Sequence, residues 1–339
     1  MRLFFFSLPS ILTAALAAEY AIDPECELAL GPGVRDGIIS GMKEAVELAE
    51  NALEVLNQHE SDVYVQNLIR YLYGIQDRDQ IMDRVKGKKP QTHLSATPSA
   101  LSTNDEAWFN GAERSSNDVG LYCSNTRLIP HPTKPALRMN KHNRPITVRA
   151  KQVEALFKCH NHDAVLEVGT NQRYTKALTM GSYTIDLEAF KAAPGAPPLN
   201  EFKVGTGHPA NIDICSVFIR QAALEGWPLI NEERIARIRS ETFINGMTDI
   251  QRPVDGIKTF GVTMFHELTH ANIGGFFTDA DDIMEGEDPK CFNWISCTRL
   301  STLPGGRTNS DTAAILVMLL KAWRLGYYVD QDGFAHPRI

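Results

Sequence analysis

The feature that most constrains this chain is the segment His266-Glu267-Leu268-Thr269-His270, in which two histidines lie four positions apart with a glutamate between them. The preceding residues 260–265 are apolar except for one threonine, and Gly274 and Gly275 follow. This pattern predicts a helix that ends near the glycines. Positions four apart share one face of a helix, so both imidazoles can bind one Zn²⁺ at about 2.0–2.1 Å. The sequence therefore predicts a zinc site on a helix with apolar flanks.

Glu267 adds a catalytic group to this predicted site. With zinc held by the two histidines, the carboxylate lies beside the water that the metal activates, where it can act as general base for attack on a peptide carbonyl. It takes the water's proton and passes it to the leaving amine. The same pattern can also arise by chance, as two histidines at the edge of a core beside a solvated glutamate.

Two histidines need a third protein ligand. A metzincin has glycine three residues and histidine six residues after the second histidine, but Ile273 and Phe276 occupy these positions, so that class is excluded. Glu285 and Glu287 lie in a segment punctuated by Gly and Pro, which does not favour a glutamate ligand from a later helix. What remains is the acidic run at 279–288. One of its carboxylates can bind the metal while the others face water.

The first 17 residues predict a secretory signal peptide. Arg2 precedes an apolar run at 3–12, and Ala15-Leu16-Ala17 places small residues where a signal peptidase reads them. No later segment has about 18 unbroken apolar residues, so no membrane anchor is expected after cleavage. We therefore expect a secreted, extracellular protein in which residues 18–339 form a single domain.

The charge of the chain is acidic, with 34 Lys and Arg against 41 Asp and Glu, a net charge of −7. Runs of basic residues are lacking, and this argues against nucleic-acid binding. Loss of Arg2 with the signal peptide changes the net charge from −7 to −8. Six of the acidic residues lie within 279–288, directly after the predicted zinc helix. The local acidity is expected to favour basic substrates.

Apolar residues at a 3.6-residue period predict an amphipathic helix over 38–57 and a second helix over 65–72. A strongly apolar helix is predicted over 311–325, with Asn309 or Ser310 as its cap.

Strand patterns are confined to short segments. Residues 183–187 and 212–218 alternate like strands. Residues 86–120 are polar and predict a long loop, and residues 128–148 show little periodicity. Helices first, short strands in the middle and helices last indicate an α+β domain. The domain is expected to comprise N-terminal helices at 34–73, insertion-rich loops and strands at 75–205, and a catalytic core at 206–330.

Taken together, these residues resemble the aspzincins, the deuterolysin-like and lysine-specific metalloendopeptidases, which are mainly secreted fungal enzymes. Their pattern is H-E-x-x-H, an Asp before an aromatic-Gly-aromatic turn, and an Asn-Ala-Asp segment that opens a helix. Here the turn corresponds to 288–294 and the later segment to 309–312. Cys26 before a long helix and the strand with a Cys at 214–218 are also similar. The resemblance implies a zincin-like metallopeptidase fold, with N-terminal helices, a small sheet, an active-site helix and a C-terminal helix.

The resemblance also implies that two histidines and one aspartate bind one zinc ion per chain, with Glu267 as base. Counting back from the aromatic turn indicates Asp288. We prefer this residue because the turn and the helix after it are the better reference point for matching the sequence to the family pattern. Counting forward from the paired glycines indicates Asp281 instead, and Asp282 remains a further alternative.

The resemblance implies two substrate-pocket residues, Phe292 and Asp311. Phe292 departs from the family pattern, and Asp311 has a second interpretation. Phe292 stands where the family has a tyrosine whose hydroxyl is thought to stabilise the oxyanion, and loss of such a donor can cost about 10²–10³ in rate. Asn293 replaces the glycine of the turn. Asp311 resembles the family's aspartate near the pocket, which some members use to select lysine. It is equally typical of a carboxylate favoured at a helix N-terminus.

An even number of cysteines in an exported chain favours three disulfides, and no spacing forms a zinc knuckle. The resemblance implies the pairs Cys26–Cys123 and Cys159–Cys215, which leaves Cys291–Cys297. Residues 159–163 contain two histidines, but His-x-His does not converge on one helix face, so a surface segment is expected there.

The sequence thus predicts a monomeric, secreted zinc metalloendopeptidase that acts on proteins or peptides. Because Phe292 lacks the hydroxyl, one alternative is a catalytically weak or inactive zinc-binding or host-surface protein of the same fold. A further alternative is a secreted cell-wall protein without a metal.

Overall fold

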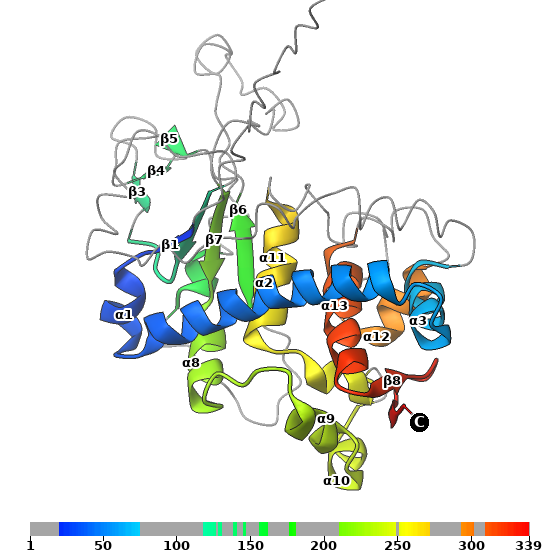
Figure 1. The fold of residues 1–339 in the computed structure, drawn as a ribbon. Helices are drawn as coiled ribbons and strands as arrows, with labels where there is room; N and C mark the ends of the chain where they lie inside the picture. The colour runs from blue at the N-terminus through cyan, green and yellow to red at the C-terminus, as the bar shows by residue number, and fades with distance from the viewer. Residues whose placement is uncertain are drawn as a thin grey trace, which may run out of the picture.

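The structure, a computed structural model, describes residues 20–74, 118–126, 128–130, 138–140, 145–146, 156–161, 176–180, 210–248, 251–271, 293–301 and 309–338. These residues form helices and small sheets, which confirms the α+β class (Figure 1). The predicted signal peptide, the strand at 183–187 and the acidic run at 279–288 lie outside the described residues.

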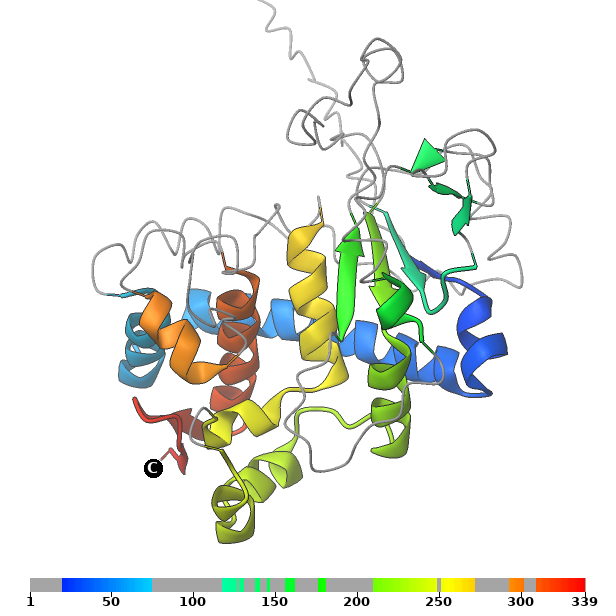
Figure 2. The same cartoon turned by 180° about the vertical axis from the view of Figure 1, so that it is seen from behind.

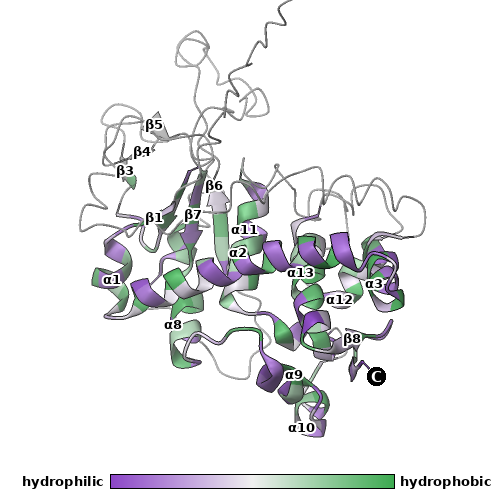
Figure 3. Cartoon of the chain, in the orientation of Figure 1, coloured by the Kyte–Doolittle hydropathy of each residue, from purple (hydrophilic) through white to green (hydrophobic). Residues whose placement is uncertain are grey.

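The N-terminal part is helical. Its helices are α1 (Glu25–Leu30), α2 (Val34–Gln58) and α3 (Val63–Tyr73). The last two confirm the predicted helices at 38–57 and 65–72. The carboxylate of Asp62 caps α3 by accepting hydrogen bonds from the backbone N–H groups of Tyr64 and Val65. Figure 3 shows hydrophilic residues along the outer side of α2, as its amphipathic pattern predicts.

Four short strands form the main sheet. They are β1 (Tyr20–Ile22), β2 (Val119–Tyr122), β6 (Ala177–Met180) and β7 (Ala210–Ile214), in the order β1-β2-β7-β6. β1, β2 and β7 run parallel, whereas β6 is antiparallel to β7 and lies at the edge. α2 runs across one face of the sheet, and α11 (Phe260–His270) contacts β6 (Figures 1 and 2). The edge strand therefore borders the helix that carries the predicted site.

The long-loop prediction for 86–120 is wrong at its end, since Val119 and Gly120 pair with Ala210 and Asn211 in the sheet. All four residues of β2 are buried, so this strand lacks the alternation of polar and apolar residues by which the other strands were predicted. Two smaller antiparallel sheets account for the other strands of the described residues. They consist of β3 (Leu128–Pro130), β4 (Arg138–Asn140) and β5 (Pro145–Ile146), and of β8 (Tyr327–Val329) and β9 (Ala335–Pro337).

The strand predicted over 212–218 is correct only in its first part. β7 ends at Ile214, and α8 (Ser216–Leu224) begins after Cys215. A short apolar run does not distinguish a strand from the first turn of a buried helix. Further helical segments follow: α9 (Glu232–Ile238), α10 (Glu241–Asn245) and the 3₁₀ helix η2 (Pro253–Ile257).

Two C-terminal helices, α11 and α13 (Ser310–Arg324), form the centre of the core with α2, and α11 packs against both α2 and α13. The short helix α12 (Trp294–Leu300) packs against α3 and α13. α13 confirms the helix predicted at 311–325, with Asn309 at its N-cap. At Gly261 a Cβ atom would lie 2.4 Å from Oε2 of Glu44, so glycine is what allows α11 to approach α2 this closely.

Two disulfides fasten the sheet region to the helices. Cys26 pairs with Cys123 and Cys159 with Cys215, which are the two pairs implied by the resemblance. Cys297 is buried in α12, and its predicted partner Cys291 lies outside the described residues. Within the described part of the chain, no helix is both long and apolar enough to span a membrane.

Candidate metal centre

The helix that carries the H-E-x-x-H motif is fixed at its start by a buried polar contact. Thr259 caps α11, because its hydroxyl oxygen accepts a hydrogen bond from the backbone N–H of Val262 at 3.3 Å. The same hydroxyl donates to Oε2 of Glu44 at 2.6 Å. Burial raises the pKa of Glu44, while hydrogen bonds from Thr259 and Ile230 act in the opposite direction. A cap and a cross-helix hydrogen bond thus set the position of α11 relative to α2.

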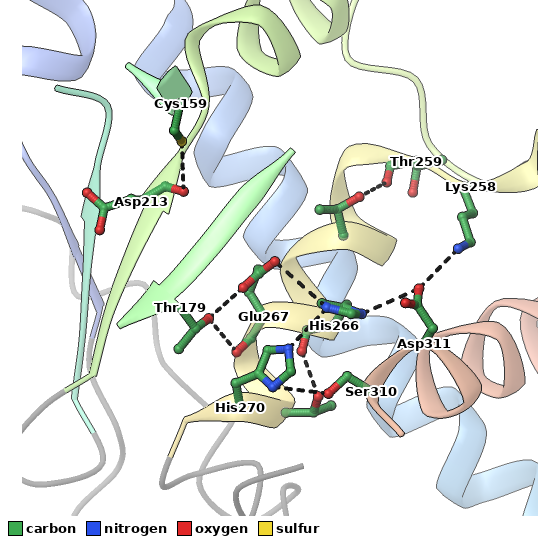
Figure 4. A network of polar contacts seen from close by, with 12 residues as sticks. Cys159, Thr179, Asp213, Lys258, Thr259, His266, Glu267, His270, Ser310 and Asp311 are labelled. Atoms are coloured by element: carbon green, nitrogen blue, oxygen red, sulfur yellow. Dashed lines mark hydrogen bonds and ion pairs between the residues drawn. The ribbon is translucent and has the colours of Figure 1, made fainter. Parts of the chain in front are cut away.

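The two histidines of the motif converge, as their helical spacing predicts. Nε2 of His266 lies 3.1 Å from Nε2 of His270, and the two ring planes are inclined by 78°. His266 is 9% exposed and Glu267 is 5% exposed, so these two side chains lie largely out of bulk water, whereas His270 is partly exposed. Both Nε2 atoms therefore face one small region (Figure 4).

Nδ1 of His266 contacts a buried carboxylate on the opposite side of the ring. It lies 3.5 Å from Oδ1 of Asp311, and the same oxygen lies 3.2 Å from Nζ of Lys258. Burial by itself raises the pKa of Asp311, but Lys258 and His266 outweigh it and hold that pKa well below its usual range. A carboxylate only accepts hydrogen bonds. The proton of a neutral His266 therefore lies on Nδ1, and Nε2 carries the lone pair.

His270 receives a similar contact from the same turn of α13. Its Nδ1 lies 3.2 Å from Oγ of Ser310. The first two residues of α13 thus contact the two imidazoles at the nitrogen that faces away from the convergence point. Metal-binding histidines typically make such a contact through the other ring nitrogen, which fixes the orientation of the ring.

Glu267 is held by a residue from the sheet. The hydroxyl of Thr179 in β6 lies 2.7 Å from Oε2 of Glu267 and 2.9 Å from its backbone carbonyl oxygen. The other carboxylate oxygen, Oε1, lies 3.9 Å from Nε2 of His266. One oxygen is therefore bound by Thr179 while the other faces the histidine nitrogens (Figure 4).

The spacing of the two histidine nitrogens is compatible with a bound zinc ion, and the Glu267 carboxylate lies beside them. The ligand atoms of His266, Glu267 and His270 all lie within 4.8 Å of one another. Tetrahedral zinc with bonds of about 2.0–2.1 Å places two ligand nitrogens about 3.3–3.4 Å apart. The observed separation of the two Nε2 atoms, 3.1 Å, is close to this value. Imidazole nitrogen and carboxylate oxygen are both ordinary zinc ligands.

The predicted site residues divide into two groups. His266, Glu267, His270 and Asp311 lie together, although Asp311 lies behind His266 and contacts Lys258. The candidates for the third ligand and the pocket residue of the aromatic turn lie outside the described residues; they are Asp281, Asp282, Asp288 and Phe292.

Three side chains that contact the candidate site were not predicted from the sequence as site residues. Thr179, Lys258 and Ser310 contact the motif residues directly or through Asp311, across 40 to 88 positions of the chain. Ser310 was identified only as a possible helix cap. Neither Thr179 nor Lys258 stands in a pattern that indicates a site.

The expectation of a surface segment at 159–163 is wrong for its first residues. Nε2 of His160 lies 2.9 Å from Oδ1 of Asp213 in β7, and both side chains have no exposed area. The adjacent disulfide between Cys159 and Cys215 holds this segment against the end of the strand, where solvent is excluded. His160 therefore belongs to a buried polar pair of the core.

Comparison with known proteins found no matching protein-family model, no matching curated protein and no matching solved structure.

Proposed function

We propose that this protein is a secreted, zinc-dependent metalloendopeptidase of the aspzincin type with a zincin-like fold. The observation that carries the proposal is the convergence of the two Nε2 atoms, 3.1 Å apart, beside the Glu267 carboxylate on a buried helix. The contacts of Asp311 and Ser310 with the Nδ1 atoms add support, since they orient both rings toward one point. The substrate is a protein or peptide, and the active form is a monomer that holds one zinc ion.

Zinc, when bound by His266, His270 and a carboxylate of the acidic run, supplies a Lewis acid that lowers the pKa of water and polarises a carbonyl oxygen. The chain's own contribution to proton transfer comes from Glu267. Oε1 faces the histidine nitrogens and is the atom that accepts the proton of the attacking water. The same carboxylate then returns the proton to the amine that leaves.

Thr179 keeps this carboxylate in one orientation. Its hydroxyl binds Oε2, so rotation of the carboxylate away from the histidines breaks a hydrogen bond to a charged acceptor. The proton-accepting oxygen is thereby held ready for the reaction.

A second candidate function is zinc binding without efficient catalysis. It is favoured by Phe292, which lacks the hydroxyl that the family resemblance implies at that position. On this alternative the metal binds tightly, but peptide bonds are cut slowly or not at all.

One experiment separates these functions. Purified mature protein is analysed for zinc content and incubated with a broad peptide library, with and without a chelator. We expect about one zinc per chain and chelator-sensitive cuts. Glu267→Gln is expected to keep the zinc and abolish the cuts, while Glu232→Gln, an exposed change on α9, leaves both unchanged. Zinc without cuts in the unaltered protein supports the second function, and absence of zinc overturns both.

A further inference from the structure

Lys258 occupies a fixed position directly before the motif helix. It follows η2 and precedes Thr259, the N-cap of α11. Arg234 of α9 donates hydrogen bonds to the carbonyl oxygens of Ile257 and Lys258, at 3.0 and 2.6 Å. The backbone from which the lysine side chain extends is therefore held by a second helix.

The side chain of Lys258 forms a buried ion pair. Nζ lies 3.2 Å from Oδ1 of Asp311, and the two side chains are only 14% and 7% exposed. Exposed ion pairs contribute little because water screens them, whereas removal of one partner from a buried pair leaves an uncompensated charge. The position of the Asp311 carboxylate thus depends on Lys258.

One oxygen of Asp311 is shared between the lysine and the metal-site histidine. Oδ1 is the atom nearest both to Nζ of Lys258 and to Nδ1 of His266. Asp311, in the first turn of α13, therefore lies between Lys258, which precedes α11, and His266 within α11 (Figure 4). A shift of the carboxylate changes the contact that orients the imidazole.

We propose that Lys258 is a positioning residue for metal binding, which acts through Asp311 to hold His266 with its Nε2 toward His270. The inference rests on the proposed function in that it takes the metal to be zinc. Lys258 itself neither contacts the metal nor touches the substrate.

The test measures zinc affinity by competition with a chromophoric chelator, independently of any peptidase activity. Outer-shell partners of metal-binding histidines typically contribute about 10–100-fold to metal affinity. We expect Lys258→Met to weaken zinc binding by a factor in this range and Lys258→Arg, which keeps the charge, to restore much of it. Lys321→Met, near the far end of α13, is the matched control and should bind zinc like the unaltered protein.

A double-mutant cycle tests whether the lysine acts through the aspartate. If it does, Lys258→Met adds little further loss in a chain that already carries Asp311→Asn. Should Lys258→Met alone leave too little folded protein, the double variant remains measurable, because it removes both charges of the buried pair.

The outcomes separate this inference from the proposed function. If the unaltered protein binds zinc and Lys258→Met binds it equally well, the positioning role is overturned while the proposed function stands. Equal losses from Lys258→Met with and without the Asp311 carboxylate also overturn the role. If the unaltered protein binds no zinc, both proposals fail.

Discussion

The hydroxyl of Thr179 lies 2.7 Å from Oε2 of Glu267, although 88 positions separate the two residues in the chain. This hydrogen bond joins the edge strand of the main sheet to the middle of the motif helix. It connects the orientation of the proposed general base to the position of the sheet.

Thr179→Val removes this hydrogen bond while it keeps the shape of the side chain. A hydrogen bond to a charged group contributes about 1.5–3 kcal/mol, so we expect kcat/KM for a peptide substrate to fall about 10–100-fold. Zinc affinity, measured separately by chelator competition, should stay the same. Thr179→Ser retains the hydroxyl and serves as control. Unchanged kinetics in the valine variant would remove Thr179 from the proposed mechanism.

Asp311 offers a test between metal positioning and substrate selection. Its charge is already paired with Lys258, so we do not expect it to attract a substrate lysine. Asp311→Asn should weaken zinc binding by about 10–100-fold. The ratio of kcat/KM for a lysine peptide to that for its norleucine analogue should not change, at saturating zinc. A large fall in this ratio with unaltered zinc affinity would instead support the pocket role implied by the family resemblance.

The third zinc ligand is expected to be Asp288. Asp288→Asn should reduce zinc affinity by more than the factor of about 10–100 that is typical of an outer-shell partner, while Asp281→Asn and Asp282→Asn have small effects. Titration of the three zinc-free variants with zinc compares them directly. If Asp281→Asn or Asp282→Asn shows the largest loss, that residue replaces Asp288 as the ligand.

Glu44 is expected to make stability depend on pH. Burial raises its pKa in the folded state, despite hydrogen bonds from Thr259 and Ile230. Between the ordinary glutamate value of about 4.3 and this raised value, the folded state binds the proton and the unfolded state does not. Glu44 therefore stabilises the fold progressively as the pH falls through this window, and the contribution is lost as the pH rises.

Glu44→Gln removes that titration. The free energy of unfolding of the zinc-free protein, relative to this variant, should increase as the pH is lowered, by at most about 1.4 kcal/mol for each pH unit within the window. Urea unfolding at several pH values measures the difference. A difference that does not vary with pH would contradict the assignment.

The buried pair of His160 and Asp213 is expected to matter for stability and not for metal binding. His160→Leu leaves the Asp213 carboxylate buried without its imidazole partner. Breaking a buried pair typically costs about 3–5 kcal/mol, which urea unfolding can measure. The double variant with Asp213→Leu should recover part of this loss, and zinc content should not change in either. A loss below about 1 kcal/mol would place the pair among those of little energetic weight.

Several correct predictions followed from local sequence patterns, namely apolar periodicity and residue spacing. The apolar period of α2 and α3 and the capped apolar stretch of α13 led to the right helices. The spacing of His266 and His270 was sufficient to predict that both rings share one face of a helix, since that geometry depends only on positions four apart. Strands were harder to predict. β2 is buried on both faces, and the apolar residues after Ile214 begin a helix and do not extend the strand.

The sequence by itself determined the proposed metal-binding face of α11 and the identity of its proposed base, because both follow from helical geometry within one turn. Only the tertiary structure decided which side chains contact them. Thr179 contacts Glu267, and Ser310 contacts His270. Asp311, which is paired with Lys258, contacts His266. These contacts arise where α11 packs against β6 and α13. Packing between elements distant in the chain is set by the shape of the whole core, and local periodicity does not encode which side chains meet there.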